Sequence, residues 1–229
     1  MIRPQRSDEF GCDSCRDDQN RWYGHLDQLG SNEDGLILLR CPRCSSLYEN
    51  TAGGWDATRR LTKDEAHGRF PDAAWPPLLL LDVDGVLMPV GRSLPPGFVR
   101  HRTDEYDVVI AESHGEWLRA LVPLFDLVWA TTWGTKAGEI FGRLLDLPEA
   151  EAVPLTALAK SGTRELPDVA RFVGDRPFAW VDDELYEDAF EWASARGVPS
   201  LLVRTDAGVG LREREVDLLR VFGEQVASR

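Results

Sequence analysis

The stretch LLLLDVDGVL, residues 78–87, decides the fold of this 229-residue chain. Four consecutive leucines indicate a strand that is buried on both faces, which is typical of the centre of a parallel sheet. Asp82 and Asp84 follow the leucines directly, at the carboxyl end of the strand, where open α/β sheets bind their ligands. Two carboxylates this close need a cation or a shared proton, because their repulsion otherwise raises one pKa.

Two later segments also end an apolar strand with polar side chains. Thr131 follows the apolar residues 127–130, and Asp182 and Asp183 follow residues 177–181. Each pattern alone is common at turns and helix N-caps. Three polar strand ends that meet at one edge of a sheet favour a metal and phosphate site instead.

Residues 82–86, Asp-Val-Asp-Gly-Val, resemble the first motif of the haloacid dehalogenase (HAD) superfamily. The resemblance implies that Asp82 is a nucleophile and Asp84 a general acid and base. It also implies Mg²⁺ bound by Asp82, by the main-chain carbonyl of Asp84 and by a later acidic pair. Asp182 and Asp183 match that pair, as the fourth motif: Asp182 would complete the Mg²⁺ ligands, and Asp183 would support them from behind or through water.

The second motif of the superfamily ends in Thr or Ser, which Thr131 matches better than Thr132. The third motif is a Lys or Arg, and here the chain departs from the pattern. Lys160 is the natural candidate, whereas the spacing before residues 167–169 points nearer Arg164 or Glu165. The phosphate-binding cation is therefore either Lys160 or Arg164.

The resemblance also reaches a particular HAD branch, named for its occurrence in Swiss Army Knife RNA repair proteins. It covers the segment from Trp75 to the C-terminus and is carried by residues 112–118, 129–131, 176–180 and 201–204. Strands alternate with helical patterns over the same segment, which predicts a three-layer, doubly wound, Rossmann-like α/β domain with a mostly parallel sheet. Helices are expected at residues 116–124, 136–145, 167–172 and 212–226, and a flap or hairpin over residues 88–111.

All four cysteines lie in the first fifth of the chain, in two CxxC pairs: Cys12, Cys15, Cys41 and Cys44. This is the spacing of a tetrahedral Cys₄ zinc site, and four thiolates leave no open position for substrate, so its role is structural. Disulfides are the alternative, but residues 1–6 lack the apolar core of a signal peptide, so the thiols are expected to stay reduced. A redox role is disfavoured because no βαβ frame surrounds either pair.

These patterns divide the chain into three parts. Residues 1–54 are expected to form a zinc-ribbon-like domain, which glycines end, and residues 77–229 a HAD-like catalytic domain. Residues 55–76 are expected to hold a short helix and a connector. Thr62 is its predicted N-cap and Glu65 completes a capping box.

Composition limits the partners of this chain. The formal net charge of −13 disfavours a nonspecific nucleic-acid binder, which needs clustered Lys and Arg. Several basic residues follow the first motif, and they could form either a local basic groove for the substrate or a solvated loop: Arg92, Arg100, His101 and Arg102. No stretch is apolar and long enough to span a bilayer, which favours a cytoplasmic protein.

Several other residues are expected to be structural. His114 is interpreted as a surface or packing residue, and four tryptophans as core residues because they flank apolar strands or helix faces: Trp117, Trp129, Trp133 and Trp180.

The pattern favours a Mg²⁺-dependent phosphohydrolase that forms an aspartyl-phosphate on Asp82. The name of the HAD branch that the chain resembles implies RNA or DNA ends as candidate substrates. A small metabolite is equally allowed. Two alternatives stay open: a binding module on a degenerate HAD scaffold, and a phosphotransferase with an acceptor other than water.

Overall fold

The structure is a computed structural model that describes residues 11–18, 25–51, 54–91, 94–103 and 106–228. The chain divides into two compact units, Met1–Trp75 and Pro76–Arg229, and each is described by itself. Among the described residues, no helix has both the length and the apolar character that crossing a bilayer requires.

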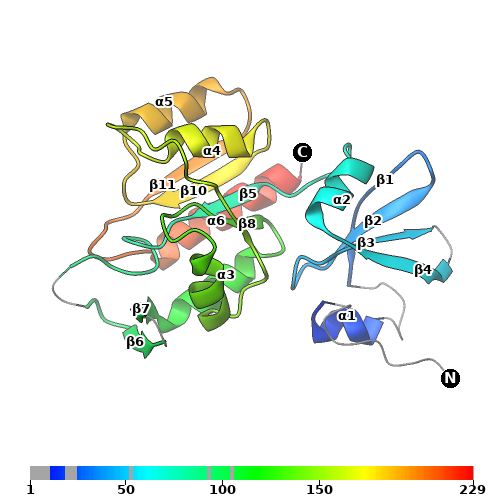
Figure 1. Ribbon diagram of the computed structural model, residues 1–229, viewed down its shortest axis with the longest axis horizontal. Helices are drawn as coiled ribbons and strands as arrows, with labels where there is room; N and C mark the ends of the chain where they lie inside the picture. The colour runs from blue at the N-terminus through cyan, green and yellow to red at the C-terminus, as the bar shows by residue number, and fades with distance from the viewer. Residues whose placement is uncertain (1–10, 19–24, 52–53, 92–93, 104–105, 229) are drawn as a thin grey trace. The chain divides into compact units, whose positions relative to one another are not determined.

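The larger unit is built on a five-stranded parallel sheet (Figure 1). In spatial order the strands are β11 (Ser200–Arg204), β10 (Phe178–Asp182), β5 (Leu78–Leu81), β8 (Asp126–Trp129) and β9 (Glu151–Ala152). The chain runs outward from β5 to β8 and β9, and then crosses to the other side of β5 to form β10 and β11. The gap between β5 and β10 is therefore the topological switch point, where open parallel sheets bind ligands.

Both faces of this sheet are covered, as a strand of four leucines predicts. Leu78 and Leu80 pack with one group of buried residues, and Leu79 and Leu81 pack with the other, because successive strand side chains point to opposite faces. The first group is covered by α4 (Leu166–Val173) and α5 (Glu187–Ala195), the second by α3 (Glu112–Leu121), the π-helix η1 (Gly138–Gly142) and α6 (Glu213–Ala227). Figure 1 shows α4 and α5 together on one side of the sheet. The α/β architecture with a parallel sheet is confirmed.

Helix boundaries differ from the predicted ones. Helix α3 begins at Glu112 rather than residue 116 and ends at Leu121, shortly before Pro123, whose nitrogen cannot donate a helical hydrogen bond. The helix predicted over residues 136–145 contains η1, a turn with i→i+5 hydrogen bonds that apolar periodicity cannot reveal. Helix α5 is an addition, since the sequence patterns above did not indicate it.

A β-hairpin follows the first motif, as expected. Strands β6 (Phe98–Arg102) and β7 (Asp107–Ala111) pair antiparallel, apart from the main sheet. Arg100 and Arg102 lie on β6, exposed, with nitrogens 3.9 and 3.4 Å from carboxylate oxygens of Asp107. Arg92 lies outside the described residues. The basic side chains described here are thus solvated and face an acidic neighbour.

The smaller unit holds a four-stranded antiparallel sheet, helix α1 (Asp13–Asp18) and helix α2 (Lys63–Arg69). The strands, in spatial order, are β1 (Asp27–Ser31), β2 (Leu36–Arg40), β3 (Leu47–Thr51) and β4 (Gly54–Leu61). The expected end of the ribbon near Gly54 is corrected, because β4 begins there and pairs with β3 as far as Leu61. The sequence of residues 21–26 also predicts a short strand, and residues 21–24 of that segment lie outside the described residues.

Helix α2 begins as its sequence predicts. The Glu65 amide donates to Thr62 Oγ1 over 3.2 Å, and the Thr62 amide donates to Glu65 Oε2 over 2.9 Å, which completes the capping box. The half-exposed Arg59 and Arg69 donate to the buried Glu49 over 2.8 and 2.6 Å. These ion pairs join β3 to β4 and to α2.

Candidate functional site

The first candidate site lies at the switch point between β5 and β10. The parallel register pairs Leu81 with Val181, and the Asp82 amide donates to the Val181 carbonyl over 3.0 Å. The two strands therefore end side by side. One carboxylate oxygen from each of Asp82, Asp182 and Asp183 lies within 4.8 Å of the others. The structure thus brings together acidic residues that are separated by 100 positions in the sequence.

Burial and repulsion from neighbouring acids raise the pKa of all three carboxyls. Burial raises the pKa of Asp82 well above its usual range, and Asp182 raises it further, while a hydrogen bond from the Thr131 side chain lowers it. Burial raises the pKa of Asp182 to about 7, against a hydrogen bond of 2.7 Å from the Glu184 amide. Positive charge is needed to keep three carboxylates ionised at this spacing. Their oxygens therefore suit a hard divalent cation such as Mg²⁺.

The turn after β5 is shaped for Asp183. Gly85 has a φ of +70°, a left-handed conformation that favours glycine. A Cβ atom at Gly85 would lie 2.3 Å from the Asp183 carboxyl carbon, so only a glycine leaves room for that carboxylate. The Thr205 hydroxyl donates to the Gly85 carbonyl over 2.9 Å and holds the turn from β11.

Thr131 lies beside Asp82, where the resemblance placed it. It follows β8, is only 2% exposed, and hydrogen-bonds the Asp82 side chain. Thr132, the alternative, is exposed. Leu81 pairs with Trp129, so Asp82, one residue beyond β5, and Thr131, two residues beyond β8, reach the same edge of the sheet.

The side chain of Asp84 lies outside the three-carboxylate group. Its Oδ2 accepts a hydrogen bond of 2.9 Å from Trp133 Nε1. Trp129 and Trp180 are fully buried, as predicted, and Trp117 packs half-buried against the core. Trp133 also packs against the core, as predicted, and in addition its indole nitrogen donates to Asp84.

Segment 153–165, expected to carry the third motif, differs from the resemblance. Lys160 and Arg164 are both exposed. Glu165 is buried, and its charge acts on Asp182. Burial raises the pKa of Glu165, Arg164 lowers it, and Asp183 raises it further. Sequence reasoning missed Glu165 as a neighbour of the site, although the spacing before residue 167 pointed to this position.

Buried hydrogen bonds anchor this segment to the start of α5. Thr163 is completely buried, its hydroxyl donates to Asp188 Oδ1 over 2.9 Å, and the Tyr186 amide donates to Thr163 Oγ1 over 2.8 Å. These bonds thereby hold the neighbouring Arg164 and Glu165 close to the start of α5.

His114 is a packing residue, as interpreted. It is fully buried on α3, with Nε2 3.1 Å from the Leu211 carbonyl oxygen and its ring edge-on to Phe98. Burial lowers the pKa of His114, which keeps the ring neutral, and the Leu211 carbonyl offsets part of this effect.

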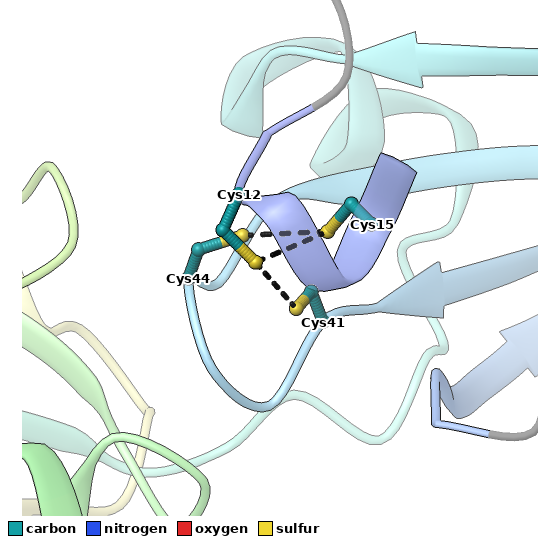
Figure 2. A group of neighbouring side chains, drawn as sticks. All are labelled: Cys12, Cys15, Cys41 and Cys44. Atoms are coloured by element: carbon teal, nitrogen blue, oxygen red, sulfur yellow. Dashed lines mark hydrogen bonds between the residues drawn. The ribbon is translucent and has the colours of Figure 1, made fainter. Parts of the chain in front are cut away.

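The second candidate site is the cysteine cluster of the smaller unit (Figure 2). The Sγ–Sγ distances are 3.7 Å from Cys12 to Cys15, 4.0 Å from Cys12 to Cys41 and 3.6 Å from Cys15 to Cys44. Sulfurs around a tetrahedral Zn²⁺, each about 2.3 Å from the metal, lie about 3.8 Å apart, whereas a disulfide requires about 2.05 Å. The arrangement therefore fits a closed Cys₄ zinc site.

Local backbone geometry orients these thiols. The Ser45 amide donates to the Cys41 carbonyl over 2.9 Å, and Ser45 has a positive φ of 57°, so the second pair forms a tight knuckle. Hydrogen bonding with Cys15 and Cys44, followed by burial, raises the pKa of Cys41, whereas bonds from Cys15 and Cys41 lower that of Cys44. Without a cation the cluster cannot hold four thiolates, which is the chemistry of a metal site.

The doubly wound sheet, with acidic residues beyond β5 and β10 at its switch point, defines a HAD-type domain. A model of the family described as the HAD domain in Swiss Army Knife RNA repair proteins matches residues 78–216. The chain belongs to this family. A comparison with curated proteins gives no match. Family membership supports a HAD-type phosphohydrolase in general, HAD domains generally use Mg²⁺, and the cysteine cluster is compatible with a zinc ribbon.

Proposed function

We propose that this chain is a Mg²⁺-dependent phosphomonoesterase that hydrolyses its substrate through an aspartyl-phosphate on Asp82. The observation that carries the proposal is the convergence of Asp82, Asp182 and Asp183 at the switch point of the sheet. The partly buried position of Asp82 and its hydrogen bond to Thr131 support the choice of nucleophile, because they orient one carboxylate oxygen.

In the first step, an oxygen of Asp82 attacks phosphorus, and the bond from phosphorus to the leaving oxygen breaks as Asp84 gives that oxygen a proton. In the second step, Asp84 takes a proton from water, the water oxygen bonds to phosphorus, and the bond from phosphorus to Asp82 breaks. When the phosphate binds, the Thr131 hydroxyl, which donates to Asp82 in this structure, would turn to donate to the phosphate, together with the exposed Lys160 or Arg164.

Mg²⁺ would be held by Asp82, Asp182, Asp183 and the Asp84 carbonyl, and it supplies positive charge that offsets repulsion between carboxylate and phosphate. These residues fit a Mg²⁺ ion because burial and neighbouring acids raise the pKa values of the Asp82 and Asp182 carboxyls. A bound cation would offset the repulsion between these acids.

We further propose that the phosphate esters are the 3′ or 5′ ends of RNA or DNA. The family description, which names RNA repair proteins, supports this substrate class. The net charge of −13 argues for recognition of a terminus by local contacts rather than for binding along a polyphosphate backbone.

The test is hydrolysis of p-nitrophenyl phosphate and of 3′- and 5′-phosphorylated oligonucleotides, with Mg²⁺ or with a chelator. Asp82→Asn should lose essentially all activity, and it should lose the acid-stable, hydroxylamine-sensitive label that the unmodified chain acquires from ³²P-labelled substrate. Asp217→Asn, an exposed substitution on α6, is the matched control. Full activity in Asp82→Asn would remove the nucleophile from the mechanism.

We also propose that the Cys₄ cluster binds one structural Zn²⁺. The sulfur spacing supports this assignment. Four thiolates leave no open coordination position, so the ion would stabilise the fold of the smaller unit rather than take part in catalysis.

A further inference from the structure

Trp133 stands out among the residues that the mechanism above does not use. It lies two residues beyond Thr131, is partly buried, and points its indole N–H at Asp84 Oδ2 over 2.9 Å. The two residues are 49 positions apart, so only the fold brings them together.

Two aromatic rings fix the orientation of the Trp133 indole. The Tyr106 ring lies at 5.1 Å and 64° to it, and the Phe141 ring at 5.2 Å and 88°. Both are edge-to-face contacts, a favoured geometry for aromatic pairs. Tyr106 directly precedes β7, and its hydroxyl is 2.8 Å from Lys136 Nζ, whose ammonium also lies 5.0 Å from the ring centroid. Tyr106, from the hairpin, and Phe141, from the π-helix η1, thus both pack against the Trp133 indole.

The chemistry of the indole restricts what Asp84 can do. An indole N–H only donates, so Asp84 Oδ2 can only accept. When Asp84 carries a proton, that proton must therefore be on Oδ1, which Trp133 does not engage. The hydrogen bond thus decides which oxygen of the acid is free to meet the leaving group, and it stops the carboxyl from rotating.

We propose that Trp133 is a positioning residue for the acid step: its indole N–H holds Asp84 so that Oδ1 delivers the proton to the leaving oxygen. This inference rests on the proposed phosphomonoesterase function. Under this proposal the indole N–H of a packed tryptophan contributes to protonation of the leaving group.

The test compares two substrates of similar shape that differ in their need for a proton. Benzyl phosphate releases a poor leaving group, which must be protonated as it departs, whereas 2,4-dinitrophenyl phosphate releases a stable phenoxide. The measurement is kcat/KM for each, from phosphate release with Mg²⁺, because kcat/KM reports the steps up to formation of the phosphoenzyme. The ratio of the two values is independent of the fraction of a variant that is folded.

In Trp133→Phe, kcat/KM should fall about 10- to 100-fold for benzyl phosphate and less than about 3-fold for dinitrophenyl phosphate, since general acids contribute roughly 10²- to 10⁴-fold. Trp117→Phe makes the same chemical change in a half-buried tryptophan of α3 that contacts His114, and its ratio should equal that of the unmodified chain. An unchanged ratio in Trp133→Phe would overturn the proposal.

A double variant separates action through Asp84 from a general effect on the site. Asp84→Asn should shift the ratio at least as far as Trp133→Phe, and adding Trp133→Phe to Asp84→Asn should shift it no further. A further shift in the double variant would mean that Trp133 acts by another route, which contradicts the proposal. If the unmodified chain hydrolyses neither ester nor any phosphorylated oligonucleotide, the proposed function itself fails.

Discussion

The two candidate metal sites are built in opposite ways. The carboxylates follow strands of a sheet with a buried core on each face, and those cores contain no member of the acidic group. In the smaller unit, Cys15 and Cys41 are themselves members of a buried cluster with Leu39 and Tyr48. The proposed Mg²⁺ would therefore act on a scaffold with its own core, whereas the proposed Zn²⁺ would contribute to folding, because two of its ligands belong to a buried cluster.

The largest expected effect tests the second half of this comparison. Cys41→Ser, or removal of zinc by a chelator, should unfold the smaller unit, since zinc binding contributes on the order of 10 kcal/mol in such sites. Amide hydrogen exchange should show loss of protection in β2 and β3 while β5 and β10 stay protected.

Ser14→Ala is the control, because Ser14 contacts Arg43 near the cluster without offering a thiol. Protected β2 and β3 amides in the zinc-free chain would contradict a metal-dependent fold.

The next prediction concerns the preformed geometry of the carboxylate site. Gly85→Ala should lower Mg²⁺-dependent phosphatase activity by about 100-fold or more, because the new Cβ overlaps the Asp183 carboxylate. Steady-state kinetics over a range of Mg²⁺ concentrations measure the loss.

Gly97→Ala is the matched control. Gly97 has a comparable φ of +86°, but a Cβ there would meet nothing within 4 Å. Both variants carry the strain of a left-handed alanine, roughly 1 kcal/mol, and only Gly85→Ala should lose activity. Equal activity in the two variants would show that phosphatase activity does not depend on the position of the Asp183 carboxylate.

A smaller effect is expected on stability. Burial raises the pKa of Asp182 to about 7, so the folded chain keeps a proton that the unfolded chain releases above about pH 4. The contribution of Asp182 to the free energy of unfolding of the metal-free chain is therefore full below about pH 4, and it is lost as the pH rises through 7. Asp182→Asn should raise the metal-free free energy of unfolding by about 1–3 kcal/mol at pH 8 and have little effect at pH 4.

Urea unfolding in the presence of a chelator measures this difference. Mg²⁺ should stabilise the unmodified chain and have a weaker effect on Asp182→Asn. A variant that is less stable than the unmodified chain at pH 8 would show that these carboxylates do not strain the metal-free fold.

The smallest expected effect is a pH dependence of stability that arises from the buried His114 in the core of the larger unit. Burial lowers the pKa of His114, so the unfolded chain binds a proton below about pH 6.5 that the folded chain rejects. Stability should fall as the pH drops below about 6.5 towards the folded-state pKa, and His114→Gln should remove this slope.

Urea unfolding across this range measures the slope, with or without a chelator. His101→Gln, on β6, is the control and should keep the slope. A slope that survives in His114→Gln would assign the pH dependence to other groups.

Much of the candidate site could be predicted from short-range sequence patterns. The apolar run of β5, the acidic residues beyond β5 and β10, and the position of Thr131 could all be read from the chain, because strand burial and strand ends leave a local signature. The two CxxC pairs and the capping box of Thr62 are equally local. Each of these features needs only neighbouring residues to be recognised.

Only the tertiary structure decided which side chains finish the site. The contact of Trp133 with Asp84, the buried Glu165 beside Asp182, and the clearance that Gly85 leaves for Asp183 join residues 17 to 98 positions apart. Such contacts depend on strand order, on the hairpin and on the π-helix, which determine how distant segments pack. Periodicity and motif spacing are silent about them, since a sequence records which residues are buried but not which buried residues meet.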